Sequence, residues 1–410
     1  MVNVTNPSES CRQIIPTYEH SESSVYLHFA LSRSKAGSAL AAIIIWANGS
    51  IYQVIVYYFR KIFMKAIIFH EQGGIDKLCY EDVRAPVIEP SEVLVRVRVC
   101  AVNHLDIRAR RDRPEVQPFP HILGSDIAGD VVEVGHGVRD LTVGARVVLS
   151  PCIPCGQCAD CRNGDENMCD FQEILGFQTN GGYAEYVKVP GQNAMPISPE
   201  LAYHHAAALP IAYLTAWHML VIRAEIRPGD DVLILSAGSG IGSASLQIAK
   251  LCGARVFATA STEEKLERAR EMGADFTINY TQTDFSEAIR EITGGRGVDI
   301  VVEHVGAATW AQSIASLAKK GRLVSCGVTT GNIGQLNIRQ MYQKQLTIMG
   351  SALGTTSELR TIIRLAEQGK LVPIIDRVLP LQEAAAAHRI LEARENFGKI
   401  CLCPNDIGRK

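Results

Sequence analysis

The chain has 410 residues, a formal net charge of -2 and 12 cysteines. Its length allows two domains with separate cores. The charge is nearly even and has no blocks of one sign, which excludes a nucleic-acid-binding stripe or a polybasic lipid patch. The expected partner is therefore a small molecule. Cysteines scattered along so long a chain indicate thiols and metal ligands in a reducing compartment rather than a disulfide scaffold, and we therefore expect a cytoplasmic protein.

Residues 1–63 differ in character from the rest and are predicted to form an N-terminal extension. Residues 36–59 carry no charge, and an apolar run longer than the ~20 residues that a bilayer requires could be a membrane helix. Asn48-Gly49-Ser50 interrupts the run, and the β-branched and aromatic residues around it favour a hairpin equally well. We expect a dispensable or poorly ordered leader. A membrane anchor or a targeting peptide, with membrane-associated or organellar localisation, is the alternative.

The sequence from Met64 to about Pro190 is predicted to be mainly β. Residues 93–99, VLVRVRV, alternate apolar and charged positions, which is typical of a strand with one exposed face. Short apolar runs with Gly and Pro punctuation follow. We place the first domain at residues 64–212, with a cysteine-rich lobe at residues 150–170.

Four cysteines of this lobe have the spacing C-x2-C-x2-C-x7-C, namely Cys155, Cys158, Cys161 and Cys169. Four thiolates can close a tetrahedral site that leaves no position open for substrate, so they predict one structural Zn²⁺ ion. An iron-sulfur cluster and unligated thiols are the alternatives. Cys152 is a further candidate ligand, but a ligand loop normally needs one distant member to wrap around the ion, which favours Cys169.

Strand-like and helix-like segments alternate in the second half, after a helical stretch that begins at Ala206 (AAALPIAYLTAWHML). This alternation predicts β-α-β units and a doubly wound parallel sheet, hence an α/β fold. We place this nucleotide-binding domain at residues 213–352. The tail, residues 353–410, ends in a helix and a strand that could return to the first domain. The predicted strands are DVLILS, ARVFATA, DFTINY, VDIVVEHV, GRLVSCG and QLTIMGS.

The segment AGSGIG follows the first of these strands and opens a helix. Glycines there allow backbone N–H groups to approach a pyrophosphate at the positive end of the helix dipole. We therefore expect cofactor contacts from Gly238, Ser239, Gly240, Ile241 and Gly242. The turn departs from strict G-x-G-x-x-G, and a merely tight structural turn is the alternative.

The second strand ends at Ala260 without the acidic residue that would hold the ribose 2'-hydroxyl of NAD. A 2'-phosphate would not be repelled there, and Ser261 and Lys265 could hydrogen-bond it, which favours NADP(H). Ser261 could also cap the following helix, with Glu264 completing a capping box.

These features, together with GGYAEYV at residues 181–187, resemble the medium-chain dehydrogenases/reductases from Met64 to about Pro404. The resemblance implies a GroES-like catalytic domain followed by a Rossmann domain, a structural zinc in the cysteine lobe, and a homo-oligomer, either a dimer or a tetramer. The zinc alcohol dehydrogenases of this family carry a second, catalytic zinc.

The ligand positions of that second zinc hold different residues in this chain. The segments AVNHLD, GSD and IAYLTAW place Asn103, Ser125 and Ile211 where the family has Cys, His and Cys, and Asp126 where it has Glu. An amide, a hydroxyl and an alkyl group cannot replace two thiolates and an imidazole around zinc. The catalytic zinc is therefore expected to be absent.

The remaining residues resemble the quinone oxidoreductase and zeta-crystallin branch, which uses NADPH and lacks catalytic zinc. Two departures are Arg108, where that branch has tyrosine, and the cysteine lobe, which it typically lacks. The residues that match are Asn103 and Asp106 in its N-x-x-D segment, Lys265 and Tyr280 at the 2'-phosphate, and Thr215 near the nicotinamide.

Without a Lewis acid, hydride must go to a substrate that is already electrophilic. We expect NADPH-dependent reduction of a quinone or an α,β-unsaturated carbonyl, with Asn103 orienting cofactor or carbonyl and Asp106 as its partner. His104, Tyr213 or solvent could supply the proton.

Each of these assignments has an alternative. His104 could contact the pyrophosphate or be an interior histidine, Tyr213 could serve packing alone, and His121 and His304 are assigned no role. The alternative functions are a zinc-type alcohol dehydrogenase, with unrecognised ligands such as Cys100, His104 and Asp126, and a non-catalytic cofactor-binding structural protein.

Overall fold

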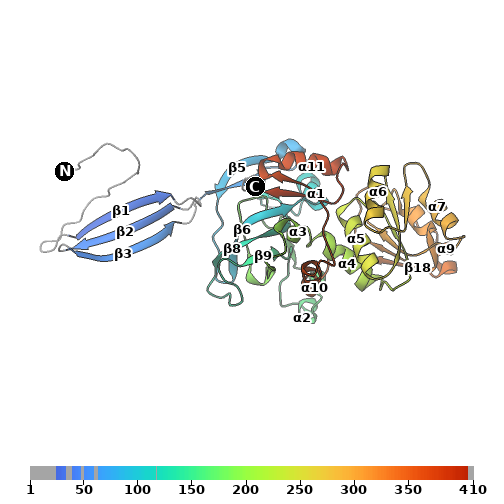
Figure 1. Ribbon diagram of the computed structural model, residues 1–410, viewed down its shortest axis with the longest axis horizontal. Helices are drawn as coiled ribbons and strands as arrows, with labels where there is room; N and C mark the ends of the chain where they lie inside the picture. Colours follow the sequence, from blue (N-terminus) through green and yellow to red (C-terminus); the bar gives the residue numbers. More distant parts are fainter. Residues whose placement is uncertain (1–24, 34–38, 48–49, 60–62, 117, 405–410) are drawn as a thin grey trace. The chain divides into compact units, whose positions relative to one another are not determined.

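The computed structural model describes residues 25–33, 39–47, 50–59, 63–116 and 118–404 (Figure 1). The chain divides into two compact units. One unit comprises Met1–Met64 with Asp82–Ala85, and the other comprises Lys65–Glu81 with Pro86–Lys410. The second unit contains both large sheets, so the domain boundaries expected after residues 212 and 352 stay predictions.

The first unit contains an antiparallel sheet of β1 (Val25–Arg33), β2 (Ala39–Ala47) and β3 (Ser50–Phe59). The uncharged run is therefore strand on both sides of residues 48–49, as the hairpin alternative predicted, and the membrane-helix alternative is wrong for the described part of it. None of the helices in the described part of the chain has the length and hydropathy of a membrane span. The expectations for residues 1–24, 34–38, 48–49 and 60–62 lie outside the described residues.

The first half of the second unit is mainly β, as predicted. Its antiparallel core has the order β13-β9-β8-β6-β21-β20, with β12 also paired to β6, and β4 lies between β5 and β7 in a smaller sheet. The elements are β4 (Phe63–Phe69), η1 (Ile75–Lys77), β5 (Cys79–Arg84), β6 (Glu92–Ala101), α1 (His104–Asp112), β7 (His121–Ile122), β8 (Asp126–Val134), β9 (Arg146–Leu149), β10 (Cys152–Ile153), α2 (Ala159–Asn163), η2 (Glu166–Met168), β11 (Glu173–Ile174), β12 (Tyr186–Pro190), η3 (Gly191–Asn193), β13 (Ala194–Pro196) and α3 (Tyr203–Ala207).

Strand β6 shows why the alternating sequence forms this sheet. Its odd-numbered valines, residues 93 to 99, are buried. Arg96 and Arg98 on its other face pair with Asp130 of β8, at 3.2 and 2.6 Å. One face therefore packs in the core while the other carries ion pairs, as the alternation predicted.

The second half is a parallel sheet with helices on both faces. Its order, β16-β15-β14-β17-β18-β19, is that of a Rossmann fold. The elements are α4 (Ala212–Trp217), the π-helix η4 (His218–Arg223), β14 (Asp231–Ile234), α5 (Gly240–Leu251), β15 (Arg255–Ala260), α6 (Glu263–Glu271), β16 (Phe276–Asn279), α7 (Phe285–Ile292), β17 (Val298–Glu303), α8 (Trp310–Ala315), β18 (Leu317–Ser325), α9 (Ile338–Lys344) and β19 (Thr347–Gly350).

Successive residues of the central strands pack into two separate cores. On β14, Val232 and Ile234 belong to a cluster with residues of α4 and α5, whereas Leu233 belongs to a cluster with residues of α7 and α8. Because both faces are covered, the strand is apolar without alternation. The helical stretch expected from Ala206 is interrupted by Pro210, so that α3 and α4 are separate helices.

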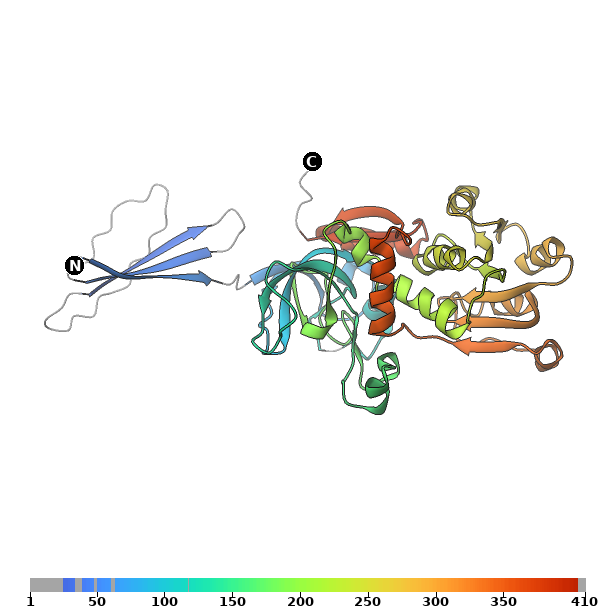
Figure 2. The ribbon, with the colours of Figure 1, turned by 60° about the horizontal axis from the view of Figure 1, so that its bottom comes forward.

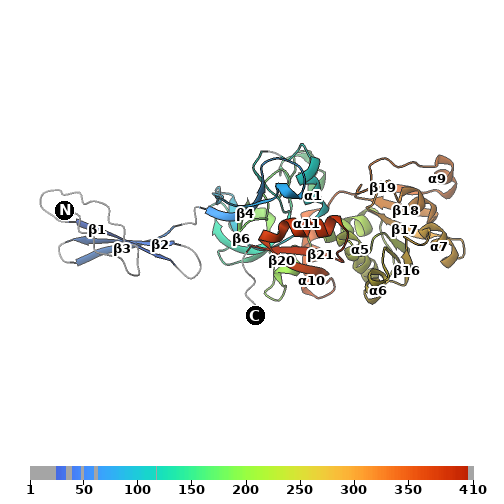
Figure 3. The same cartoon turned by 90° about the horizontal axis from the view of Figure 1, so that it is seen from above.

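The tail returns to the first sheet, as expected (Figures 1 and 3). Strand β21 pairs antiparallel with β6, where Cys401 lies opposite Ala101, and β20 runs parallel to β21. This return brings the start of β21 beside the residues that follow β6. The elements are α10 (Thr356–Glu367), β20 (Ile375–Pro380), η5 (Leu381–Glu383), α11 (Ala384–Glu392) and β21 (Lys399–Cys403).

Candidate functional site

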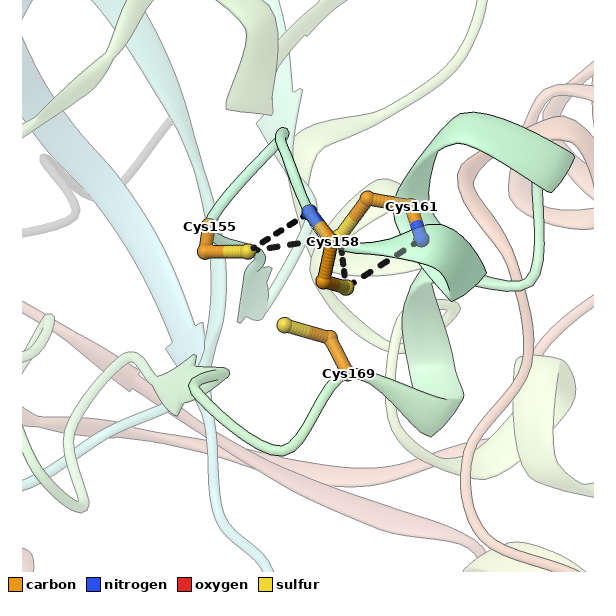
Figure 4. Close-up of side chains that lie close together, drawn as sticks. All are labelled: Cys155, Cys158, Cys161 and Cys169. Carbon is orange, nitrogen blue, oxygen red and sulfur yellow. Dashed lines mark hydrogen bonds between the residues drawn. The ribbon is translucent and has the colours of Figure 1, made fainter.

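The cysteine lobe brings four thiols to one point (Figure 4). The Sγ atoms of Cys155, Cys158, Cys161 and Cys169 all lie within 4.8 Å of one another. The Sγ atom of Cys161 is 3.8 Å from that of Cys155 and 3.3 Å from that of Cys158. Sulfurs bound at about 2.3 Å to a tetrahedral Zn²⁺ are about 3.8 Å apart, so the donors and their spacing fit one zinc ion. With four protein ligands, such an ion has no open position for substrate.

Local backbone geometry supports this arrangement. The N–H groups of Cys158 and Cys161 donate to the sulfurs of Cys155 and Cys158, each at 3.4 Å. Cys152 lies outside the group: its thiol donates to Gln172 Oε1 at 2.6 Å, and burial raises the pKa of that thiol to about 12.

The lobe also contacts the start of the returning tail. Glu166 Oε1 accepts the backbone N–H of Thr356 at 2.5 Å, and Asn167 Nδ2 donates to the carbonyl of Ala352 at 3.2 Å. Helix α2 accordingly lies near α10 (Figures 1 and 2). A fixed lobe therefore fixes the segment that leads from the parallel sheet back to the first sheet.

A second group of polar side chains surrounds the ammonium of Lys399. Nζ lies 2.6 Å from Asn103 Oδ1 and 2.9 Å from Asp126 Oδ2. Asn103 Nδ2 donates to the same carboxylate oxygen at 2.9 Å, while Asp126 Oδ1 accepts the backbone N–H of Ile211 at 2.8 Å. The three side chains are buried, with Asp126 fully so. A lysine ammonium thus lies beside Asn103, which holds one of the positions compared with zinc ligands, and beside Asp126, which follows another.

Asp106 lies beside this group and bonds to the backbone of Asn103 at the start of α1. Its carboxylate accepts the backbone N–H of Asn103 at 2.7 Å, the N–H of Gly124 at 3.2 Å and the hydroxyl of Tyr183 at 3.3 Å. Burial raises the pKa of Asp106 to about 7, although the hydrogen bonds from Asn103 and Tyr183 act in the opposite direction. Tyr183 is in turn 3.1 Å from His388 Nε2.

The two candidate proton donors have different surroundings. His104, the first residue of α1, keeps exposed surface, yet the protein around it lowers its pKa to about 4, by desolvation first and then by interactions with His304, Arg394 and Lys399. Its ring is therefore neutral at neutral pH. Tyr213 is 1% exposed, accepts a hydrogen bond from Gln247 Nε2 at 2.9 Å and packs in the core, and burial raises its pKa. This environment favours the packing alternative for Tyr213.

The glycine-rich turn forms a cradle at the carboxyl end of β14. A Cβ on Gly242 would lie 2.2 Å from the carbonyl oxygen of Ser236, and one on Gly240 would lie 3.1 Å from Lys399 Cδ. Glycine at these positions therefore permits the close packing of the first turn of α5 against the turn after β14 and against the stem of Lys399. The residues expected to contact the cofactor lie together in this turn and in the first turn of α5. They are Gly238, Ser239, Gly240, Ile241 and Gly242.

Ser239 links the turn to the end of β17. Its Oγ accepts the N–H of Gly242 at 2.9 Å and lies 3.0 Å from His304 Nε2. The other ring nitrogen of His304, Nδ1, is buried and has no partner among the described residues. The glycine cradle and this unpaired polar atom both fit a dinucleotide at the switch point of the sheet.

The expected 2'-phosphate contacts follow neighbouring strands. Ser261 follows β15 and Tyr280 follows β16, and the last residues of these strands, Ala260 and Asn279, are in register. Their side chains therefore start from the same edge of the sheet. Thr215 lies on α4 and is buried.

The cap of α6 differs from the expectation. Thr262, not Ser261, is the N-cap, and its Oγ1 accepts the N–H of Lys265 at 3.3 Å. The capping-box alternative with Glu264 was therefore wrong, because the helix starts one residue later. Lys265 Nζ donates to the carbonyl of Arg394, and desolvation lowers the pKa of Lys265.

A surface hollow of about 470 Å³ lies at the other edge of the parallel sheet, lined by Asp231, Arg255 and Arg296 among others. Both arginines pair with Asp231, at 2.6 and 3.2 Å. Ligands of such sheets bind at the carboxyl ends of the strands, and this hollow is at the amino ends of β14 and β15. It is therefore distinct from the cofactor cradle.

Lys399 is a residue of this group that the sequence did not reveal, because it lies far along the chain from Asn103 and Asp126. His304, to which the sequence gave no role, is almost fully buried, and the hydroxyl of Ser125 is fully buried without a partner among the described residues. The position of His304 at the end of a predicted parallel strand was the available signal, because that edge binds ligands.

Comparison with known proteins identifies matching domains in both halves. Residues 89–199 match the alcohol dehydrogenase GroES-like domain, and residues 240–368 match the zinc-binding dehydrogenase domain.

Similar whole proteins have related activities. The chain is 33% identical over 347 residues to an NAD-dependent alcohol dehydrogenase of Sulfolobus acidocaldarius, covering 83% of this chain and 99% of that protein. It is 31% identical over 354 residues to a 2-haloacrylate reductase of a Burkholderia species, covering 83% and 98%. A crystal structure of an NAD-dependent alcohol dehydrogenase superposes with a TM-score of 0.81 at 44% identity, covering 83% of this chain and all of that one.

Proposed function

The chain belongs to the zinc-binding alcohol dehydrogenase superfamily of medium-chain dehydrogenases/reductases, and on that premise we propose that it reduces quinones or α,β-unsaturated carbonyls with NADPH, without a catalytic zinc. An NAD(P)H-dependent oxidoreductase follows from the family itself. The acceptor class and the preference for NADPH are the proposal.

The position of Lys399 is the observation that carries the proposal. Its ammonium is hydrogen-bonded to Asn103 and forms a buried ion pair with Asp126. A dication at the same place would be repelled by this charge and would find the amide of Asn103 and the carboxylate of Asp126, with neither a thiolate nor an imidazole bonded there. Polarisation of an alcohol or of a simple carbonyl by a metal is therefore disfavoured.

The acceptor must then be electrophilic before it binds. The relative named 2-haloacrylate reductase acts, by its name, on a carbon–carbon double bond conjugated to a carboxyl group, which belongs to this electronic class. The relative named alcohol dehydrogenase favours the second candidate, oxidation of alcohols or reduction of aldehydes.

Asn103 and His104 would have different roles in this reaction. Asn103 is a positioning residue, because its amide is committed to Lys399 and Asp126. The neutral ring of His104 retains an N–H that can donate to the acceptor oxygen, and water supplies the proton that completes the reduction. A reduced nicotinamide, when bound, would supply hydride for the electrophilic carbon of the acceptor.

The cofactor assignments extend this proposal. Ser261, Lys265 and Tyr280 would hold the 2'-phosphate of NADPH, Thr215 would lie near the nicotinamide, and the cysteine lobe would hold one structural Zn²⁺. A homo-oligomer, dimer or tetramer, is carried over from the family resemblance.

The test is NADPH oxidation by the purified chain with quinones, enones, 2-haloacrylates, saturated aldehydes and alcohols, together with zinc stoichiometry on the same preparation. We expect turnover with the electrophilic acceptors and one zinc per chain. Preference for a saturated alcohol with NAD⁺, accompanied by two zinc ions per chain, would support the alcohol dehydrogenase instead. Tight NADPH binding without turnover on any acceptor would favour a structural cofactor-binding protein.

A further inference from the structure

His304 is the first residue after β17 and is 8% exposed. Its Nε2 lies 3.0 Å from Ser239 Oγ, and its Nδ1 is buried without a hydrogen-bond partner among the residues that the structure describes. Buried polar groups of proteins are almost always hydrogen-bonded, and this unpaired nitrogen lies at the ligand-binding edge of the parallel sheet, beside the glycine-rich turn, where a ligand can supply its partner.

The surroundings determine which ring nitrogen carries the proton. Ser239 Oγ already accepts the N–H of Gly242, and among the described residues its own O–H has one acceptor within reach, His304 Nε2. If Ser239 donates to Nε2, a single donor is left unpaired, which is Nδ1–H. The opposite tautomer would leave both the serine proton and the Nδ1 lone pair unpaired. We therefore assign the proton to Nδ1.

Burial also keeps this ring neutral, since desolvation lowers the pKa of His304 to about 4. A neutral Nδ1–H is suited to a hydroxyl or carbonyl oxygen. His304 is also close enough to His104 of α1 to contribute to the lowered pKa of that residue, so the two rings lie near each other.

The strand order indicates which half of the cofactor lies nearby. The second strand, β15, is on one side of β14 and carries the residues expected at the adenosine ribose, whereas β17 is on the other side. A dinucleotide crosses the sheet where the strand order reverses, which is between β14 and β17. The end of β17 therefore faces the nicotinamide nucleotide.

We propose that His304 is a cofactor-binding residue whose Nδ1–H donates to an oxygen of the nicotinamide nucleotide half of NAD(P)(H), with Ser239 holding the ring in that tautomer. This inference rests on the proposed function only in that the chain binds the dinucleotide.

The test measures dissociation constants by titration calorimetry, with NADPH and NADH as whole cofactors and 2',5'-ADP as the adenosine half. His304→Phe should weaken the whole cofactors about tenfold and leave 2',5'-ADP within about twofold, since only the nicotinamide half loses a donor. His304→Gln, which retains an N–H, should recover part of the loss. His121→Phe is the matched control, because His121 is also buried with an unpaired nitrogen, on β7, and it should change neither constant.

Unchanged NADPH and NADH binding by His304→Phe would overturn the inference, and so would an equal loss for 2',5'-ADP, which would indicate a distorted turn. A second readout does not depend on the variant folding: in the ¹⁵N spectrum of the unmodified chain, Nδ1 of His304 should be the protonated nitrogen and should shift when NADPH is added. A protonated Nε2, or no shift, would also overturn it. Absence of any NADPH or NADH binding by the unmodified chain would instead refute the proposed function first.

Discussion

Lys399 and Asp126 form a buried ion pair in which Nζ lies 2.9 Å from Oδ2 and the side chains are 4% and 0% exposed. The stem of the same lysine packs against Gly240, where a Cβ would lie 3.1 Å from Cδ. One side chain therefore joins the nucleotide turn to Asp126 at the start of β8 and to Asn103 at the start of α1.

Substitution of Lys399 should lower the free energy of unfolding. Lys399→Met leaves Asp126 charged, buried and without its cation, so we expect the free energy of unfolding to fall by about 3–5 kcal/mol, measured by urea denaturation. Lys399→Met combined with Asp126→Asn should recover most of this loss, because the amide can still accept the N–H of Ile211. Lys77→Met, which breaks an exposed pair with Glu71, should have no measurable effect. Equal stability of Lys399→Met and the unmodified chain would contradict the prediction.

The cysteine lobe should lose its metal when one ligand is removed. Cys169→Ser replaces one of four clustered thiols, and elemental analysis should show zinc falling from about one ion per chain toward none. Cys152→Ser is the matched control and should retain the ion, since Cys152 bonds to Gln172 outside the group. If both variants kept or lost zinc together, the ligand set would be wrong.

Loss of that zinc should also loosen the tail. Glu166 and Asn167 of the lobe hold Thr356 and Ala352. After chelation, we expect faster amide hydrogen exchange at the start of α10 while the parallel sheet stays protected.

Asp106 should make stability decline as pH rises. Its pKa of about 7 in the folded state exceeds the ordinary value of 3.8, so between these values the folded state binds more protons than the unfolded state, and the free energy of unfolding falls with increasing pH. Asp106→Asn removes this contribution. The stability of the unmodified chain relative to the variant should therefore fall between pH 4 and pH 8, by at most about 4 kcal/mol.

The measurement is urea denaturation of both proteins across that range. Asp130→Asn is the comparison, because hydrogen bonds from Tyr203 and Arg98 outweigh burial and lower the pKa of Asp130, so its titration lies below the range. A stability difference for Asp106→Asn that did not change with pH would exclude the raised pKa.

Lys265 should select NADPH over NADH. If its ammonium contacts the 2'-phosphate, Lys265→Ala should weaken NADPH binding about tenfold and leave NADH binding nearly unchanged. Lys250→Ala, at the far end of α5 and paired with Asp275, should leave the ratio of the two constants as it is. Equal weakening of both cofactors by Lys265→Ala would indicate a structural role through its contact with Arg394.

Local patterns in the sequence predicted most of the fold. The alternation of β6, the apolar runs of the parallel strands and the glycine turn before α5 each reflect burial or backbone demands within a few residues, so they can be read without tertiary information. Two local predictions were wrong, each because of a single residue. Pro210 separates α3 from α4, and Thr262 rather than Ser261 caps α6.

The sequence by itself predicted the cysteine ligand set and the dinucleotide turn, because metal and pyrophosphate sites need particular residues at short, fixed spacings. Only the tertiary structure placed the ammonium of Lys399 between Asn103 and Asp126. Lys399 is 296 residues from Asn103 in the chain, and its ammonium reaches Asn103 because β21 returns to pair with β6. His304 meets Ser239 in the same way, across two parallel strands. Such contacts depend on how distant strands pair and pack, and no local spacing records that.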